Sequence, residues 1–270
     1  MIELTRLWDI LQTVRRETPL VHHITNLVVT NFTANATLAM GASPVMSHSI
    51  DEVQEMVSAA RALVLNIGTL DARQIEAMIA AGREANRLGV PVVLDPVGVG
   101  ATELRTRSVI EIMSEVEVDI LRGNTSEIAI VGGTDSAIRG VDAVGESADV
   151  ARLARGVAAE MGCVVAATGP EDAVSDGRRT YRIQNGHPLM GAVTGTGCVA
   201  TSVVAACDAV ADDPVRAAVA GLSYLGCAAE RASVSAEGPG SFAVHLLDEL
   251  YGTTCEDYRA AARIVADGGG

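Results

Sequence analysis

Short apolar runs alternate with longer segments of helical periodicity along this chain, and that alternation limits the folds open to it. The predicted strands are 62–68 (ALVLNIG), 91–98 (PVVLDPVG), 118–124 (VDILRGN) and 163–169 (CVVAATG). Runs that are apolar throughout are typical of strands buried on both faces of a parallel sheet. The sequence therefore predicts an α/β fold, with a mostly parallel central sheet and helices on both faces.

Capping and turn signals define the connecting segments. Asp71 is predicted to cap a helix with Gln74 in capping-box spacing, and Gly89 is predicted to end it. Further elements are expected as helices at about 148–161, 199–210 and 214–234 and as a hairpin over 173–183 that turns at Asp176-Gly177. Because no Pro/Ser-rich linker interrupts the 270 residues, we expect one domain over 1–270, with a short flexible tail at about 266–270.

The chain contains no lysine, because all 20 residues of the Lys+Arg total are arginines. This excludes a Walker A phosphate loop, a Schiff-base enzyme and a protein kinase, each of which needs a lysine. The net charge of −14 argues against a nucleic-acid partner and against an anionic membrane surface. A nucleotide can still bind such a chain through Mg²⁺, glycine-rich backbone and a few arginines.

Cysteine usage and hydropathy point to the cytoplasm. The five cysteines are odd in number and form no CxxC pair, so neither a zinc site nor a disulfide framework is expected. The first residues (MIELTRLWDILQ) lack the pattern of a signal peptide. No apolar run approaches the roughly 20 residues of a membrane span.

Polar or small residues stand at the ends of the predicted strands, where an open α/β sheet binds its ligands. The residues in question are Gly68, Asp95, Arg122 with Asn124, and Thr168 with Gly169. An aspartate in a buried strand needs a partner or a cation, and Mg²⁺ with nucleotide phosphates is one such cation. Glu127 has two interpretations of equal weight: it completes a helix capping box with Asn124, or it lies near a metal-bound phosphate.

The segment 195–198 (GTGC) opens a predicted helix and is a candidate anion site. Glycines at a helix start let successive backbone N–H groups converge on a phosphoryl group. Close packing of the helix start against a strand is the alternative. In this position the pKa of the Cys198 thiol is expected to be lowered. Met46 has a similar pair of interpretations, as a packing residue or as part of an apolar ligand pocket.

Several long strings in fixed order resemble the hydroxyethylthiazole kinase family, within the ribokinase-like superfamily. They are VHHITNLVVTNFTANATLAMGASPVM, LVLNIGTL, VPVVLDPVGVGATELR, ILRGNTSEI, SDG, NGHPLMGAVTGTGC and GPGSF. The resemblance runs from about Pro19 to Tyr251, which is nearly the whole chain. Its length makes it far more specific than any single glycine motif.

The resemblance implies ATP-dependent phosphorylation of the hydroxyl of 5-(2-hydroxyethyl)-4-methylthiazole, a step in thiamine salvage. It implies a homotrimer with active sites at the subunit interfaces. It also implies the site residues, which are Asn26, Met46, Gly68 and Gly195 for the thiazole, Arg122 and Thr168 for ATP phosphates, Asp95 and Glu127 for Mg²⁺, and Gly195, Gly197 and Cys198 for catalysis.

Cys198 occupies the position at which sugar kinases of the superfamily carry an aspartate base. Positioning and charge stabilisation dominate a loose phosphoryl-transfer transition state, so we expect the GTGC backbone and Mg²⁺ to contribute most of the rate. Two alternatives remain open. One is another small-alcohol or pyrimidine kinase, or a hydrate dehydratase, of the same fold, and the other is a non-catalytic ligand sensor.

Overall fold

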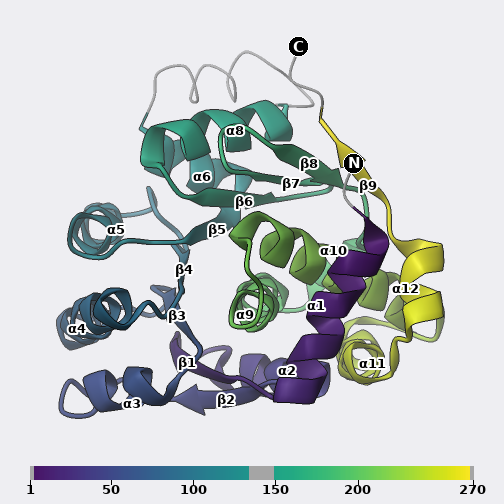
Figure 1. The fold of residues 1–270 in the computed structure, drawn as a ribbon, viewed down its shortest axis with the longest axis horizontal. Helices are drawn as coiled ribbons and strands as arrows, with labels where there is room; N and C mark the ends of the chain where they lie inside the picture. The colour runs from purple at the N-terminus through teal and green to yellow at the C-terminus, as the bar shows by residue number, and fades with distance from the viewer. Residues whose placement is uncertain (1–2, 134–148, 268–270) are drawn as a thin grey trace.

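The structure is a computed structural model that describes residues 3–133 and 149–267. Its strands form one nine-stranded sheet in the order β2-β1-β3-β4-β5-β6-β7-β8-β9 (Figure 1). The strands are β1 (Leu20–Ile24), β2 (Ser43–Met46), β3 (Ala62–Asn66), β4 (Val92–Asp95), β5 (Ile120–Asn124), β6 (Val164–Thr168), β7 (Asp172–Ser175), β8 (Thr180–Ile183) and β9 (Ile264–Ala266). Pairing is parallel from β2 to β6 and antiparallel from β6 to β9.

Helices cover both faces of the sheet, as the sequence predicts (Figure 1). One face carries α3 (Val53–Ala59), α4 (Ala72–Leu88), α5 (Glu103–Glu115), α6 (Thr125–Gly132) and α8 (Val150–Met161). The other carries α1 (Leu4–Glu17), α2 (Thr30–Met40), α9 (Thr196–Asp208) and α10 (Pro214–Val234), with α11 (Pro239–Gly252) and α12 (Cys255–Ala261) packed outside them. A 3₁₀ helix, η1 (Pro188–Ala192), precedes α9. No helix of the described residues is long and apolar enough to cross a membrane.

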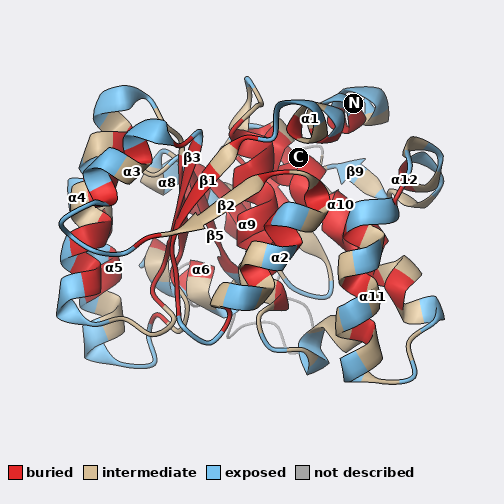
Figure 2. Cartoon of the chain, turned by 90° about the horizontal axis from the view of Figure 1, so that it is seen from below, coloured by how far each residue is buried: buried red, intermediate tan, exposed pale blue. Residues whose placement is uncertain are grey.

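Alternate residues of each strand enter two separate hydrophobic clusters. In β3, Val64 packs in the cluster that contains α9, whereas Leu63 and Leu65 pack in the cluster that contains α4. Figure 2 shows the central strands buried along their length. Burial on both faces explains why these strands are apolar throughout rather than alternating with polar residues.

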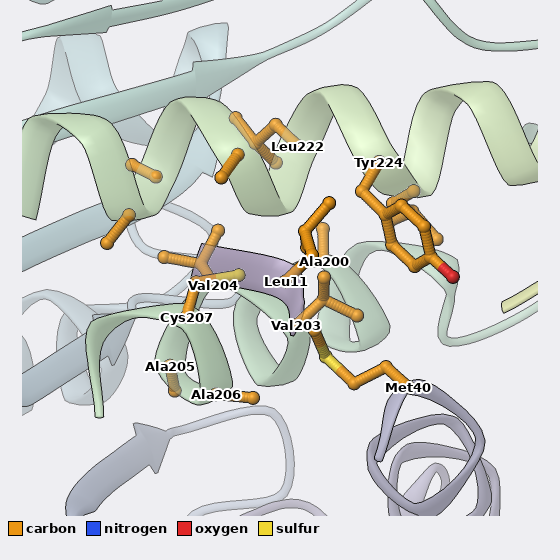
Figure 3. Close-up of a cluster of buried hydrophobic side chains, with 14 of the residues drawn as sticks. Leu11, Met40, Ala200, Val203, Val204, Ala205, Ala206, Cys207, Leu222 and Tyr224 are labelled. Carbon is orange, nitrogen blue, oxygen red and sulfur yellow. The ribbon is translucent and has the colours of Figure 1, made fainter. Parts of the chain in front are cut away.

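Small side chains let the helices on the α9 face approach one another closely. The cluster in Figure 3 consists largely of Ala and Val from α9, with Met40 of α2 and Tyr224 of α10 at its edge. A Cβ added to Gly221 of α10 would lie 3.0 Å from the Val204 Cα atom. The low aromatic content of the chain, 3%, is thus matched by a core that depends on close backbone approach.

The predicted caps and turns are confirmed. The Asp71 side chain accepts a hydrogen bond from the Gln74 backbone N–H at the start of α4, which ends at the left-handed Gly89. Gly177, with φ +85°, lies in the turn between β7 and β8. Helix α8 begins at Val150, whereas the expected first residue, Ala148, lies outside the described residues. The elements that the sequence analysis did not anticipate are α1, α2, α3, α5, α11, α12, η1, β1, β2 and β9.

Two of the residues predicted to form a flexible tail have defined partners in the structure. Ala266 pairs with Tyr181 in the sheet, and the Asp267 carboxylate forms ion pairs with Arg155 and Arg182. Both residues lie in the segment that the sequence predicts to be a flexible tail, at about 266–270. The remaining three positions of that segment, 268–270, lie outside the described residues.

Candidate active site

Four polar side chains form a row across the carboxyl ends of neighbouring parallel strands. Val64, Val93, Ile120 and Ala166 all pack toward α9, one on each strand from β3 to β6. Side chains two positions further along a strand share the same face. The residues in those positions are Asn66, Asp95, Arg122 and Thr168. The sheet therefore aims four polar groups at the helix layer that contains α9, which lies directly against β3 and β4 (Figure 1).

Asp95 and Arg122 form a buried ion pair within this row. The Asp95 carboxylate is fully buried, Arg122 is 7% exposed, and the Arg122 Nη1 atom lies 3.7 Å from Asp95 Oδ2. Burial raises the pKa of Asp95, and the guanidinium of Arg122 opposes that shift. The hydroxyl of Thr201 on α9 donates to Asp95 Oδ2 at 2.7 Å, and Arg122 Nη2 donates to Thr168 Oγ1 at 2.6 Å. The expectation that Asp95 and Arg122 are buried is confirmed.

Cys198 lies among side-chain amides at the same end of the sheet. Its Sγ atom accepts hydrogen bonds from Asn66 Nδ2 at 3.2 Å and from Asn26 Nδ2 at 3.5 Å. Gly68 packs against this group, because a Cβ added there would lie 2.7 Å from Asn26 Nδ2. Three residues predicted from the sequence, Asn26, Gly68 and Cys198, are thus brought together from three different segments.

The start of α9 packs closely against Val29 and Arg122 through two glycines. Gly195 has φ +95°, and a Cβ there would lie 2.7 Å from Val29 Cγ1. At Gly197 a Cβ would lie 3.1 Å from Arg122 Nη1. The helix start therefore packs closely against its neighbours, as one interpretation of GTGC expects, and the anion site remains a prediction that the nearby guanidinium of Arg122 supports. Partial positive charge at the helix start and the charge of Arg122 together favour an anion.

A cavity of about 540 Å³ opens next to the start of α9. Its lining includes five residues singled out from the sequence, which are Arg122, Asn124, Thr168, Gly169 and Gly197. The sequence analysis did not anticipate other lining residues, among them Asp172, Asn185, His187, Met190, Leu222 and Leu225. This volume is typical of pockets for small ligands. Leu222 and Leu225 of α10 form an apolar part of the wall.

Glu127 forms the capping box of α6. Its Oε2 atom accepts from the Asn124 backbone N–H at 2.8 Å, and Oε1 accepts from the Gly98 backbone N–H at 2.8 Å. The capping interpretation is therefore confirmed. The metal role of Glu127 remains a prediction, because an oxygen that accepts one N–H retains a second lone pair.

The carboxylates of the site fit a Mg²⁺ ion that is held mainly by phosphates and water. Asp95 Oδ1 is buried and has no hydrogen-bond partner among the described residues. In that part of the chain, no group of three or more His, Cys, Asp or Glu side chains could hold a metal ion. Mg²⁺ usually takes one or two carboxylates, with nucleotide phosphates and water completing its octahedron.

Met46 stands apart from the other predicted residues. It ends β2, the edge strand of the sheet, and pairs in register with His23 of β1. Strand β1 therefore separates it from Asn66 on β3. The substrate role of Met46 remains a prediction. Because β2 is an edge strand, a neighbouring molecule could lie against Met46.

The expected lowering of the Cys198 pKa is wrong. Burial, followed by the nearby Asp95 carboxylate, raises the pKa of the Cys198 thiol to about 11. The amide donors Asn66 and Asn26 and the charge of Arg122 favour the thiolate but do not outweigh these two effects. The sequence located the helix start, which favours the thiolate. It did not show that Cys198 is buried or that Asp95 lies close to its thiol, because both depend on the fold.

Asn66 and Thr201, which both bond to Asp95, are two further site residues that the sequence analysis missed. Asn66 pairs in register with Asp95 across β3 and β4. It is the only polar side chain in the run ALVLNIG, and alignment of the predicted strand ends would have placed it beside Asp95. Thr201 lies in an Ala-rich helix and carries no comparable signal.

Comparison with known proteins gives the family. The model of the "Hydroxyethylthiazole kinase family" matches residues 11–256. A hydroxyethylthiazole kinase of Moorella thermoacetica is 53% identical over 253 residues, which cover 94% of this chain and 95% of that protein. The chain belongs to the hydroxyethylthiazole kinase family. The family resemblance of the sequence strings is therefore confirmed.

Solved structures agree with this assignment. The structure of a hydroxyethylthiazole kinase protein from Pyrococcus horikoshii OT3 matches with a TM-score of 0.90 and 45% identity, covering 98% of this chain and 100% of that one. A ribokinase-like superfamily protein from Enterococcus faecalis V583 matches with a TM-score of 0.65 at 12% identity, covering 90% and 93%. The second match concerns the fold alone and confirms the ribokinase-like architecture.

The raised pKa of Cys198 predicts low reactivity. With a pKa of about 11, Cys198 should react with iodoacetamide at pH 8 about a hundredfold more slowly than free cysteine, since little thiolate is present. The rate should keep rising as the pH approaches 11. Site-resolved mass spectrometry measures it, with the urea-unfolded chain as control. A rate equal to that of the unfolded chain would contradict the raised pKa.

Proposed function

We propose that the protein transfers the γ-phosphoryl group of ATP to the hydroxyl of 5-(2-hydroxyethyl)-4-methylthiazole, as its family implies. One observation carries the proposal: the start of α9 lines a cavity of about 540 Å³ and also places Cys198 beside Asn26, against which Gly68 packs. A phosphoryl donor in the cavity and an alcohol beside Cys198 would meet at the helix N-terminus. The chain offers this arrangement without any lysine.

The nucleotide side of the proposed site contains Arg122 and Thr168. Arg122 is held by Thr168 and Asp95, so its remaining N–H groups would meet the phosphates with little loss of side-chain entropy. The backbone N–H groups at Gly195–Cys198 would stabilise the charge that develops on the transferred group. These donors would replace the lysine of other phosphate-binding loops.

The alcohol side contains Asn26, Met46, Gly68 and Gly195. Asn26 and Gly68 would orient the thiazole so that its hydroxyl oxygen faces the γ-phosphorus. The bond between that phosphorus and the ADP oxygen breaks as the new P–O bond forms, and the hydroxyl proton passes to a phosphate oxygen or to solvent water. Near neutral pH the Cys198 thiol is protonated, so it would assist this proton transfer only modestly.

A Mg²⁺ ion is proposed as the cofactor. When bound, it would neutralise charge on the phosphate oxygens. Asp95 would hold it through Oδ1 and Glu127 through a water molecule. The fully buried position of Asp95 beside Arg122 supports its role, since an unpaired carboxylate oxygen in this place is costly without a ligand.

A homotrimer with interfacial active sites is proposed from the family likeness and from the surface next to Asn26. Leu27 and Val28, directly after Asn26, are 75% and 68% exposed. Met46 lies on the edge strand β2, which has one strand neighbour in this chain. A second subunit that covered these residues would complete the wall of the thiazole pocket.

The proposed surroundings are those of a cytoplasmic enzyme acting on small molecules. All five cysteines are free thiols, which suits a reducing compartment. The net charge of −14 supports the proposal that neither nucleic acid nor a membrane is a partner. We also propose that residues 1–270 act as a single domain.

The function is tested by an assay of the purified protein with Mg-ATP and the thiazole alcohol. We expect equal amounts of ADP and phosphorylated thiazole, and loss of turnover when EDTA removes Mg²⁺. Turnover of a different alcohol or of a pyrimidine, with none for the thiazole, would assign the site to another kinase of this fold. Binding of the thiazole without turnover of any alcohol would indicate a sensor.

Replacement of Cys198 tests how much the sulfur contributes. We expect kcat of Cys198→Ala to fall by less than about a thousandfold, because the neutral thiol is a weak base and general-base catalysis spans roughly 10²–10⁴. The matched control is Cys163→Ala, a half-buried thiol on the far side of the sheet, which should leave kcat unchanged. A larger fall for Cys198→Ala would assign the proton transfer to its sulfur.

The interface is tested by a charge on the exposed turn after Asn26. Light scattering should give a particle of three times the 27.9 kDa chain mass for the wild type and a smaller particle for Val28→Asp. Turnover should fall together with the mass. Leu104→Asp, also at an exposed apolar position but on α5, should change neither quantity. A monomeric wild type with full turnover would refute the interfacial site.

A further inference from the structure

Asn66 is the most completely connected side chain at the carboxyl end of the sheet. It ends β3 and is 1% exposed. Its Nδ2 atom donates to Asp95 Oδ2 at 2.8 Å and to Cys198 Sγ at 3.2 Å. Its Oδ1 atom accepts from Asn26 Nδ2 at 2.9 Å and from the Gly68 backbone N–H at 3.0 Å.

These four contacts use the full capacity of a carboxamide. The nitrogen has two hydrogens to donate and the oxygen has two lone pairs to accept. The orientation of the amide is therefore fixed. The reverse orientation would place its oxygen against the Asp95 carboxylate and its NH₂ against the Gly68 N–H, and both contacts would be repulsive.

The four partners come from different segments. Asn26 follows β1, Gly68 follows β3, Asp95 ends β4 and Cys198 begins α9. The accepting side of the amide thus faces the two residues assigned to the alcohol. Its donating side faces the two residues assigned to phosphoryl transfer.

We propose that Asn66 is a positioning residue that holds the alcohol-binding residues Asn26 and Gly68 in fixed relation to Asp95 and Cys198. This inference rests on the proposed function for its kinetic consequence, but not for its geometry. Displacements of about 1 Å in such a site can reduce the rate of reaction by about 10²-fold. No other side chain described here contacts all four of these residues.

Two substitutions test the accepting oxygen and the donating nitrogen of the Asn66 amide separately. Asn66→Asp keeps the accepting oxygen and replaces the donating nitrogen by a second oxygen, so the contacts to Asn26 and Gly68 persist while those to Asp95 and Cys198 are lost. We expect KM for the alcohol within about threefold of the wild type and a fall in kcat of about 10²-fold. Asn66→Ala removes both sides, so kcat should fall similarly and KM should rise about tenfold.

The control is Ser175→Ala. Ser175 is a fully buried side chain of β7 whose hydroxyl bonds to Arg179, Thr180 and Gly177, away from the site. Its loss should lower the melting temperature without changing KM or kcat. A general structural role of Asn66 would give the same pattern as this control. The split between KM and kcat in Asn66→Asp distinguishes positioning from stability.

Amide hydrogen exchange tests the geometry without any turnover. Asn66→Ala should speed exchange about tenfold in peptides covering 25–29 and 67–70, because Gly68 N–H and Asn26 lose their acceptor. Asn66→Asp should preserve wild-type exchange there, and Asn66→Ser, which adds no buried charge and is too short to reach the four partners, takes the place of the alanine variant if that variant fails to fold. Unchanged exchange in Asn66→Ala, or equal changes in KM for both variants, would overturn the inference. If the wild type lacks turnover but exchange responds as expected, only the proposed function fails.

Discussion

Asp95 and Arg122 form a buried ion pair at the carboxyl end of the sheet, and the surrounding residues must compensate for the hydration that the two charges lose. Each ion loses several kcal/mol of hydration on burial, and a pair recovers this only with further hydrogen bonds. Asn66 and Thr201 supply them to Asp95, and Thr168 supplies one to Arg122. Asp95 Oδ1 and Arg122 Nε remain without a partner among the described residues. A buried pair with such atoms adds little to stability, which agrees with the proposed role of both residues in binding ligands.

Parallel pairing is what brings these residues together. In a parallel sheet the carboxyl ends of all strands lie at one edge, and side chains in register share a face. The registers of β3 with β4 and of β5 with β6 place Asn66, Asp95, Arg122 and Thr168, from four strands, on the face covered by α9. Helix α9 can approach closely because its start contains Gly195 and Gly197. The proposed anion site would therefore follow from sheet geometry and from close packing of the helix start.

The absence of lysine has a structural counterpart. Arg122 contacts Thr168, Asp95 and the backbone at Gly197, so its orientation is fixed by three neighbours. A planar guanidinium suits this role better than a flexible ammonium group, because it presents several donors in a rigid arrangement. The helix N-terminus adds further donors that carry no formal charge. Together they support the proposed anion site in a chain with a net charge of −14.

The sequence by itself determined the α/β class, the strands β3 to β6, the cap at Asp71 and the candidate residues at the strand ends. It could do so because periodicity, capping and glycine preferences are local properties. Only the tertiary structure decided which of these residues meet. It joined Asn26, Gly68 and Cys198 through Asn66, left Met46 at the sheet edge, and reversed the expected pKa shift of Cys198. Desolvation and neighbouring charge depend on segments far apart in the chain, so no local pattern encodes them.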